Sequence, residues 1–201
     1  MNLSDFQSLI SASRFSKYSS VNEYVLSVDR ASRTQQMLHW VEIGFRNHIY
    51  EGVQATYSNV HACDSWLTCI CTNPPILLNT GSIERIGRAK DLLSEVDQGD
   101  PNKIIPELSF GFWVRLLSSA NEPNIWTAGL HKSFPHKTKR SDLHDRLRKM
   151  NLIRNRVAHL EPVDTYTLAQ IANESMSLIH LIAPNLDEFM AKEFRRILKD
   201  I

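Results

Sequence analysis

The chain has 201 residues, of which 42% are apolar and 22% charged, and its net charge is +1. This composition is typical of a folded globular protein and argues against a disordered one. The N-terminus shows no basic segment followed by an apolar run, and no apolar stretch approaches the about 18 residues of a membrane helix. We therefore expect a cytoplasmic protein with no membrane partner, folded as a single domain over residues 1–201.

The sequence pattern favours helices throughout. Glycine is scarce, with 7 residues, and no run alternates apolar and polar residues as a half-buried strand does. The expected fold class is therefore all-α. In chain order, the predicted helices are Leu3–Ala12, Val21–Tyr57, Ser82–Val96, Phe110–Leu117, a short helix opened by Pro123, Thr138–His159, Asp164–Ile182 and Pro184–Asp200, with Ser82, Thr138 and Asp164 as N-caps. Residues 61–79 are expected to form an irregular insertion or loop, and Asp100–Pro106 a linker.

Apolar residues recur at helical spacing in three of these segments and predict their buried faces. The tryptophans Trp66, Trp113 and Trp126 are expected to pack in the core rather than to stack on RNA bases. The predicted buried positions are Leu38, Val41, Phe45, Ile49 and Val53; Phe110, Trp113, Val114 and Leu117; and Leu143, Leu147, Met150 and Val157.

The three cysteines, Cys63, Cys69 and Cys71, fall in one short stretch, and an odd number there does not indicate a disulfide framework. With His61 they offer four potential zinc ligands. Neither cysteine-containing pair has the C-x2–4-C spacing of a zinc site. Cysteines of an irregular loop are the better interpretation, and we predict neither a metal ion nor another cofactor.

Positive charge is concentrated in one stretch of the chain. Residues 131–159 contain nine lysines and arginines against two aspartates, so this stretch carries +7 and the remainder −6. A basic stripe on an acidic body is a candidate phosphate-binding surface, although a solvated helix face is the plain alternative. The candidate RNA contacts are Lys137, Lys139, Arg140 and Arg146, and their binding would weaken with salt.

The segment Arg154-Asn155-Arg156-Val157-Ala158-His159 places a fixed cation, an amide and an imidazole at a predicted helix end. Metal-free RNA cleavage needs a base for the 2′-OH proton, an acid for the leaving 5′ oxygen and a cation for the crowded phosphorane. Histidine can serve as acid or base near neutral pH, and guanidinium matches the phosphorane charge. Asn155 can position the phosphate or the histidine. The plain alternative for Arg154 and His159 is a C-terminal helix cap.

Helix geometry places Asn155 and His159, four residues apart, on one face. Arg154 and His159 are separated by about 140° around the same helix. Either the helix ends or bends before His159, or a second copy supplies the missing partner. The second option predicts a homodimer with a composite site.

Three parts of the chain resemble the Abi-like (abortive infection) group of HEPN ribonucleases. The segment from Arg154 to Pro162 is similar to that group's R-x4–6-H motif with its flanks. Glu107-Leu108-Ser109-Phe110-Gly111-Phe112-Trp113 with Leu116 resembles an upstream helix of the group. Ser13-Arg14-Phe15 with Tyr18, then Leu38, Glu42-Ile43 and Phe45-Arg46-Asn47, resembles its opening pattern.

The resemblance implies a HEPN-type helical bundle with additional helices, a homodimer, and metal-independent endoribonuclease activity that leaves a 2′,3′-cyclic phosphate. It also implies a role in phage defence or in a toxin–antitoxin pair, with an antitoxin protein or regulatory RNA as a further partner. By position, Arg154 would stabilise the scissile phosphate, His159 would be the acid or base, and Asn155 would position the phosphate. Glu42, Arg46, Asn47 and Arg156 would support them.

The chain departs from the group at three positions. Leu160 replaces a frequent second histidine, which removes an accessory proton donor. Glu161 stands where some toxin-type members have a tyrosine that an antitoxin modifies, which puts that control in doubt. Phe45 replaces a usual leucine, a change of packing only.

Two other functions fit the same residues. A catalytically inactive helical dimer could hold a partner or regulatory RNA on the basic stripe, and a helical dimer could act through other proteins. Glu42 and Arg46, four residues apart, could also form a surface ion pair only. Loss of RNA cleavage on replacement of Arg154 or His159, in the presence of a chelator, would single out the enzyme.

Overall fold

The computed structural model describes residues 3–57, 64–69, 78–159, 161 and 167–199. These residues form helices and no strand, which confirms the all-α prediction. None of the described helices combines the length and apolarity needed to cross a bilayer. The helices are α1 Leu3–Ile10, α2 Ala12–Phe15, α3 Val21–Tyr57, α4 Trp66–Cys69, α5 Thr80–Asp91, α6 Pro101–Glu107, α7 Phe110–Leu116, α8 Arg140–Ala158, α9 Leu168–Ile182 and α10 Asp187–Leu198, with short 3-10 or π turns at Asp97–Gly99, Ser119–Asn121, Glu122–Trp126, Leu130–Ser133 and Pro184–Leu186.

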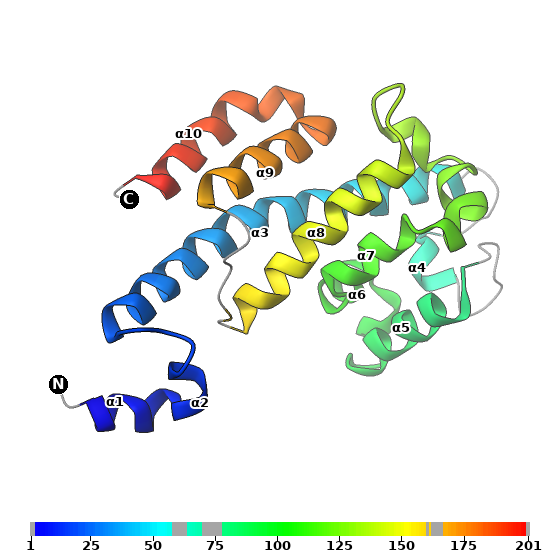
Figure 1. Cartoon of the computed structure of the whole chain (residues 1–201). Helices are drawn as coiled ribbons and strands as arrows, with labels where there is room; N and C mark the ends of the chain where they lie inside the picture. Colours follow the sequence, from blue (N-terminus) through cyan, green and yellow to red (C-terminus); the bar gives the residue numbers. More distant parts are fainter. Residues whose placement is uncertain (1–2, 58–63, 70–77, 160, 162–166, 200–201) are drawn as a thin grey trace.

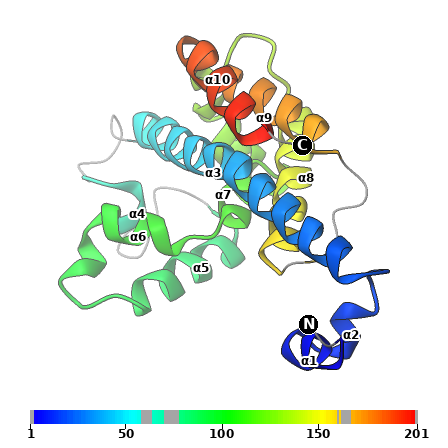
Figure 2. The same cartoon turned by 90° about the vertical axis from the view of Figure 1, so that its left-hand side faces the viewer.

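Helix α3 is the central helix of the molecule, and Figures 1 and 2 show the other long helices packed along it. Helix α8 runs antiparallel beside it, so the C-terminal end of α8 lies near the first half of α3. Helices α9 and α10 form a hairpin against one side of α3, whereas α5, α6 and α7 lie on another side (Figure 2). The two helices α1 and α2 lie beyond the start of α3.

The predicted apolar stripes form the core. All thirteen predicted positions in α3, in and directly after α7, and in α8 are buried. Burial of these side chains stabilises the helices, because most helical stability in proteins comes from the packing of an apolar face. Trp66 and Trp113 are buried and meet edge to face with ring centroids 6.2 Å apart. Trp126 is half-buried and packs against this core from its edge, so it is a core residue only in part.

The long helix was predicted with the observed ends, but several other boundaries differ. The first predicted helix ends at Ile10 as α1, and a separate short helix, α2, follows from Ala12. Helix α5 begins two residues before Ser82, because Asn79 supplies the capping oxygen to the Ser82 amide at 2.9 Å. The predicted linker at Asp100 contains α6 instead. The Asp100 carboxylate accepts from the Asn102 amide at 2.8 Å, and Pro101 occupies the first turn, where its missing N–H costs nothing.

The starts of the two helices around the candidate site also differ from the predictions. Thr138 does not cap α8, because its hydroxyl donates to the Pro135 carbonyl at 2.8 Å and closes a turn. Asp164 lies outside the described residues. Thr167 begins α9 through a reciprocal capping box with Gln170. Pro184 opens a 3-10 turn that leads into α10 rather than the helix itself.

The described part of residues 61–79 is not wholly irregular, since it contains α4. Buried Ser65 and Trp66 hold this turn against the end of α3. The Trp66 indole N–H donates to the Tyr50 carbonyl at 3.2 Å, and the Ser65 hydroxyl accepts from the Tyr50 hydroxyl at 3.1 Å. Cys69 is disulfide-bonded, contrary to the expectation of free cysteines. Residues 61–63 and 71 lie outside the described residues.

Candidate functional site

Two arginines share one carboxylate where α8 crosses α3. The Glu42 side chain accepts from Arg46 Nη2 at 3.1 Å through one oxygen and from Arg154 Nε at 3.2 Å through the other. Only 13% of the Glu42 side chain and 14% of the Arg46 side chain are exposed. Water screens such a pair weakly, so the contacts are stronger than surface ion pairs. The sequence-predicted residues Glu42, Arg46 and Arg154 are thus brought together.

The Arg154 guanidinium is held by Glu42 but keeps hydrogen-bond donors for another group. Its side chain is 40% exposed, and its only hydrogen bond to a described residue is the one from Nε to Glu42. The two terminal nitrogens therefore keep their donors for another group. A guanidinium fixed at Nε can offer those donors as a planar fork to a phosphate. Arg46 Nε is buried and has no hydrogen-bond partner among the described residues. Arg46 is therefore enclosed in the protein, where it holds Glu42 and is not presented to a ligand.

His159 is the C-cap of α8. Its amide donates to the Asn155 and Arg156 carbonyls at 3.1 Å, so the backbone completes the last turn and does not bend back toward Arg154. His159 and Asn155 are exposed, and their side chains form no hydrogen bond with a described residue. Arg154 faces α3, whereas Asn155 and His159 lie on the solvent face of α8. One copy therefore does not bring the Arg154 and His159 side chains together.

His159 lies in a groove of about 490 Å³ between the C-terminal end of α8 and the α2 region. The other lining residues are Ser11, Ser13, Arg14, Lys17 and Glu161. The Arg14 guanidinium donates from Nη2 to the His159 carbonyl at 3.4 Å, which links α2 to α8 across 145 residues of sequence. We call this groove the His159 groove.

Residue Ser11 gives the His159 groove an unusual backbone conformation. Its φ is 70°, in the left-handed region that non-glycine residues seldom adopt. The Ser11 hydroxyl caps α2 by accepting from the Arg14 amide at 3.3 Å. Cap and strain together place Arg14 directly after a sharp change of chain direction. Strained residues of this kind cluster at functional sites.

The His159 groove combines the groups that phosphodiester chemistry uses. Arg14 and Lys17 are exposed cations that can neutralise phosphates, and His159 supplies an exposed imidazole, a side chain that can act as a general acid or base. Glu161 is an exposed carboxylate that can orient an imidazole or accept a hydroxyl donor. The set does not resemble a metal site. No group of three histidine, cysteine or acidic side chains in the described part of the chain is suited to hold a metal ion.

The remaining predicted site residues divide into free and engaged side chains. Asn47, Arg156, Lys137 and Lys139 are exposed, and their side chains form no hydrogen bond or ion pair with a described residue, so Asn47 does not join the hydrogen bonds of the Glu42 cluster.

Arg140 and Arg146 are engaged inside the molecule. Arg140 forms an ion pair with Glu122 at 3.0 Å, and its Nη1 donates to the Leu117 carbonyl at 2.7 Å. Arg146 donates to Glu174 at 2.6 Å and to the Ser177 hydroxyl at 2.9 Å. We leave both out of the candidate RNA surface.

Sequence reasoning missed Arg14 and Lys17 as site residues. The resemblance did include Arg14, but only as part of an opening motif. Two cations within four residues, just after a serine-rich turn, were the available signal. Their proximity to His159 depends on the fold, because the start of α3 and the end of α8 meet only when the two helices pack antiparallel.

No protein-family model, curated protein or solved structure matches this chain.

Proposed function

We propose that this protein is a metal-independent endoribonuclease of the HEPN type, which cleaves single-stranded or loop RNA. The observation that carries the proposal is the Glu42-bound guanidinium of Arg154, whose terminal nitrogens form no hydrogen bond with a described residue. An oriented cation of this kind stabilises the extra negative charge of a phosphorane without reorganising during the reaction. The resemblance of residues 154–162 to the R-x4–6-H motif supports the same function.

The reaction is an in-line displacement at phosphorus. A base removes the proton of a ribose 2′-OH, the 2′-oxygen forms a bond to the adjacent phosphorus, and the bond from phosphorus to the 5′ oxygen breaks. An acid protonates that leaving oxygen, so the products are a 2′,3′-cyclic phosphate and a free 5′-OH. In this proposal His159 is the acid or base, Arg154 holds the phosphate, and Asn155 positions it. Unstacked RNA is favoured because in-line attack requires a flexible backbone.

The catalytic groups come from two copies in this proposal. Arg154 faces α3, whereas His159 lies in the groove with Arg14 and Lys17, so one copy presents the cation and the imidazole on different faces. A two-fold dimer joins the Arg154 of one copy to the His159 of the other. Glu42 acts as a positioning residue, and Arg14 and Lys17 hold flanking phosphates. Phage defence or a toxin–antitoxin pair, with an antitoxin protein or regulatory RNA, is the role that we propose on the resemblance alone.

The test is cleavage of a mixed, end-labelled RNA pool in EDTA. Native protein is compared with Arg154→Ala and His159→Ala, and with matched controls Arg85→Ala and His180→Ala, which replace exposed residues of α5 and α9. We expect cleavage by the native protein and both controls, cyclic phosphate ends, and a loss of at least about 100-fold in the two site variants. Equal cleavage by Arg154→Ala would overturn the proposal.

The second candidate is an RNA-binding dimer without catalysis. The observation that favours it is the exposed His159 imidazole, which no described side chain orients. The same experiment separates the two functions. Tight RNA binding without cleavage, together with unchanged affinity in His159→Ala, would establish the binding function.

A further inference from the structure

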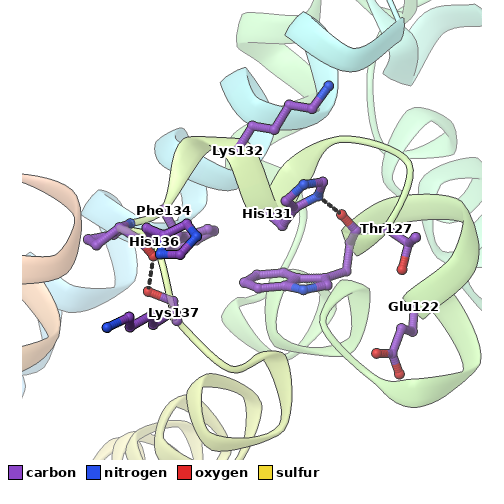
Figure 3. A pocket seen from close by; sticks show the side chains of 10 residues that line it. Glu122, Thr127, His131, Lys132, Phe134, His136 and Lys137 are labelled. Carbon is purple, nitrogen blue, oxygen red and sulfur yellow. Dashed lines mark hydrogen bonds between the residues drawn. The ribbon is translucent and has the colours of Figure 1, made fainter.

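A second hollow, of about 740 Å³, lies at the opposite end of α8 from the His159 groove. The turns between α7 and α8 form it, and Figure 3 shows Phe134 and His136 close together, with His131 set apart from them. Residues Trp126, His131, Lys132, Phe134, His136 and Lys137 are the lining groups that matter here. We call it the Trp126 hollow. Its volume is in the range of sites that hold small organic ligands.

The aromatic wall of the Trp126 hollow is rooted in the core. Trp126 stacks on Phe134, with ring centroids 5.4 Å apart and planes 30° apart. Phe134 is buried and stacks in turn on Phe45 of α3 at 6.4 Å and 20°. Trp126 is half-buried, so part of its indole is accessible to the hollow. A half-exposed indole fixed from behind is a rigid platform for another flat ring.

The exposed ring His131 is also held in place. Its Nδ1 lies 2.9 Å from the Trp126 carbonyl, and Figure 3 draws this contact. The other ring nitrogen has no partner among the described residues. It can donate to, or accept from, the edge of a base. The Trp126 hollow therefore offers a stacking surface with one hydrogen-bonding group beside it.

The charge around the Trp126 hollow is positive. Among the described lining residues the one carboxylate is Glu122, which forms an ion pair with Arg140, with 3.0 Å between Glu122 Oε2 and Arg140 Nε. Lys132 and Lys137 are exposed and have no partner among the described residues. In Figure 3 both lysines extend away from the other lining side chains, in different directions. Such cations can reach the phosphates on either side of a bound base rather than the base itself.

The loop that carries Lys137 is strained. Lys137 has a φ of 81°, in the left-handed region that a lysine seldom adopts. The Thr138 hydroxyl closes the turn onto the Pro135 carbonyl at 2.8 Å. The two non-glycine residues with positive φ in the described chain, Ser11 and Lys137, line the two pockets at opposite ends of α8. Conformations of this kind persist where the surrounding structure holds them, which is common at binding sites.

We propose that the Trp126 hollow is a nucleotide-binding subsite, which stacks one unpaired RNA base on Trp126 and contacts the flanking phosphates through Lys132 and Lys137. The inference takes its ligand class, an RNA strand, from the proposed function. Exposed cations continue along α8 toward the His159 groove, at Arg148, Lys149 and Arg156. The 19 residues of α8 span about 28 Å, which is about eight nucleotides of a stacked strand.

The test measures binding, so that it does not depend on cleavage. The probe is a labelled, 2′-O-methyl RNA strand of about 12 nucleotides, which spans both pockets and has no 2′-OH to attack. Affinity is measured by fluorescence anisotropy over a range of salt concentrations. The variants are Trp126→Leu and the double variant Lys132→Glu with Lys137→Glu. The controls are Trp40→Leu and Lys103→Glu, which change an exposed tryptophan on α3 and an exposed lysine on α6.

We expect Trp126→Leu to weaken binding by about 5- to 100-fold, the effect of losing one base–aromatic stack. The double lysine variant should lower the slope of log affinity against log salt by about 0.7 for each lost phosphate contact. Because both lysines are exposed, this variant keeps the fold and tests the inference even where Trp126→Leu is unstable. Unchanged affinity and slope in both variants would overturn the inference.

Two further outcomes have distinct meanings. Binding of AMP as tight as that of the strand would overturn the RNA subsite in favour of a free nucleotide as ligand. If the variants weaken binding but native protein never cuts unmodified RNA in EDTA, the inference stands and the proposed function fails. If cutting depends on Arg154 and His159 while the Trp126 hollow variants bind normally, the proposed function stands and the inference fails.

Discussion

Glu42 is the carboxylate that two arginines of the candidate site share. It lies between Arg46 and Arg154 with 13% of its side chain exposed. Glu42→Gln keeps the shape but leaves two guanidinium groups without a counter-charge. We expect the free energy of unfolding to fall by about 1–3 kcal/mol, measured by urea denaturation.

The matched control for Glu42→Gln is Glu84→Gln. Glu84 also pairs with an arginine four residues later, Arg88 at 3.4 Å, but both side chains are more than half exposed. Its loss should change stability by less than about 0.5 kcal/mol. Equal effects of the two substitutions would show that burial of the Glu42 cluster contributes nothing.

His48 makes stability depend on pH below about 6.5. Burial lowers its pKa below the usual 6.5, although a hydrogen bond with the Ser133 backbone opposes the shift, and its Nε2 is buried without a partner. The folded state thus binds the proton less readily than the unfolded state. Stability is complete above pH 6.5 and declines as pH falls through the window below it. His48→Phe keeps the ring contact with Phe134 and should flatten this decline, as measured by urea midpoints from pH 7.5 to 5.5.

His144 also affects the pH profile of stability, and its effect must be compared with that of His48→Phe. Burial also lowers the pKa of this α8 histidine, so a decline with the same sign remains in the His48 variant. The shift of Glu23, whose pKa is lowered by hydrogen bonds with Ser19, acts only below about pH 4.5. An unchanged pH profile in His48→Phe would rule out His48 as the source.

Among individual residues, the sequence predicted the contacts of Glu42 but not the contact between Arg14 and His159. Glu42, Arg46 and Asn47 were predicted to support the site; Glu42 contacts both Arg46 and Arg154, whereas Asn47 forms no hydrogen bond with a described residue. The partnership of Arg14 with His159 was not predicted, because it joins residues 145 positions apart through a single hydrogen bond. No local pattern encodes that contact.

The contact of α3 with the turn Leu130–Ser133 positions the Trp126 hollow. Substitution of Gly52, which lies in this contact, and of Gly87, which does not, tests the contact. A Cβ on Gly52 would lie 2.5 Å from Leu130 Cδ1 and 2.9 Å from Ser133 Oγ, so Gly52→Ala requires these side chains, or the turn that carries them, to shift. A Cβ on Gly87 of α5 would meet nothing within 4 Å. We expect Gly52→Ala to destabilise by about 1–3 kcal/mol and Gly87→Ala to stabilise by about 0.5–1 kcal/mol.

Thermal unfolding of the two glycine variants provides the measurement. Both substitutions place alanine inside a helix, so the gain in helix propensity is common to them and only the contact differs. A stabilising Gly52→Ala would show that the turn does not pack against α3 in this way.

The elements themselves were predictable where periodicity is long and unbroken. Helix α3 has its predicted ends because its apolar spacing continues over 37 residues. Helix α6 was not predicted because it has only seven residues and starts after Asp100-Pro101. This pair indicates a turn as readily as an N-cap followed by a proline in the first helical turn. The choice between these depends on packing that local sequence does not contain.

The whole molecule is organised around the two ends of α8. One end holds the His159 groove, where α2 meets the end of the helix, and the other holds the Trp126 hollow. Exposed cations lie on the helix between them, while the engaged arginines Arg140 and Arg146 hold α8 to its neighbours. A strand laid along α8 would therefore meet a stacking site at one end and the proposed catalytic groups at the other. The composition predicted the basic stripe but not this division of its arginines.

The assembly of the proposed site from two copies has a consequence that mixing reveals. Arg154→Ala and His159→Ala each lack one group of every site. In a mixed dimer, a site built from two copies pairs the intact Arg154 of one chain with the intact His159 of the other. Random mixing makes half of the dimers mixed, each with one complete site of two, so activity should return to about a quarter of the native value.

The measurement is RNA cleavage in EDTA after co-expression or joint refolding of the two inactive variants. Each variant mixed with the double variant Arg154→Ala, His159→Ala is the control and should remain inactive, because no complete site can form. If the two single variants also remain inactive together while the native protein cuts, both groups act from one chain. In that case His159 must move toward Arg154 when RNA binds, because α8 holds the two side chains on different faces.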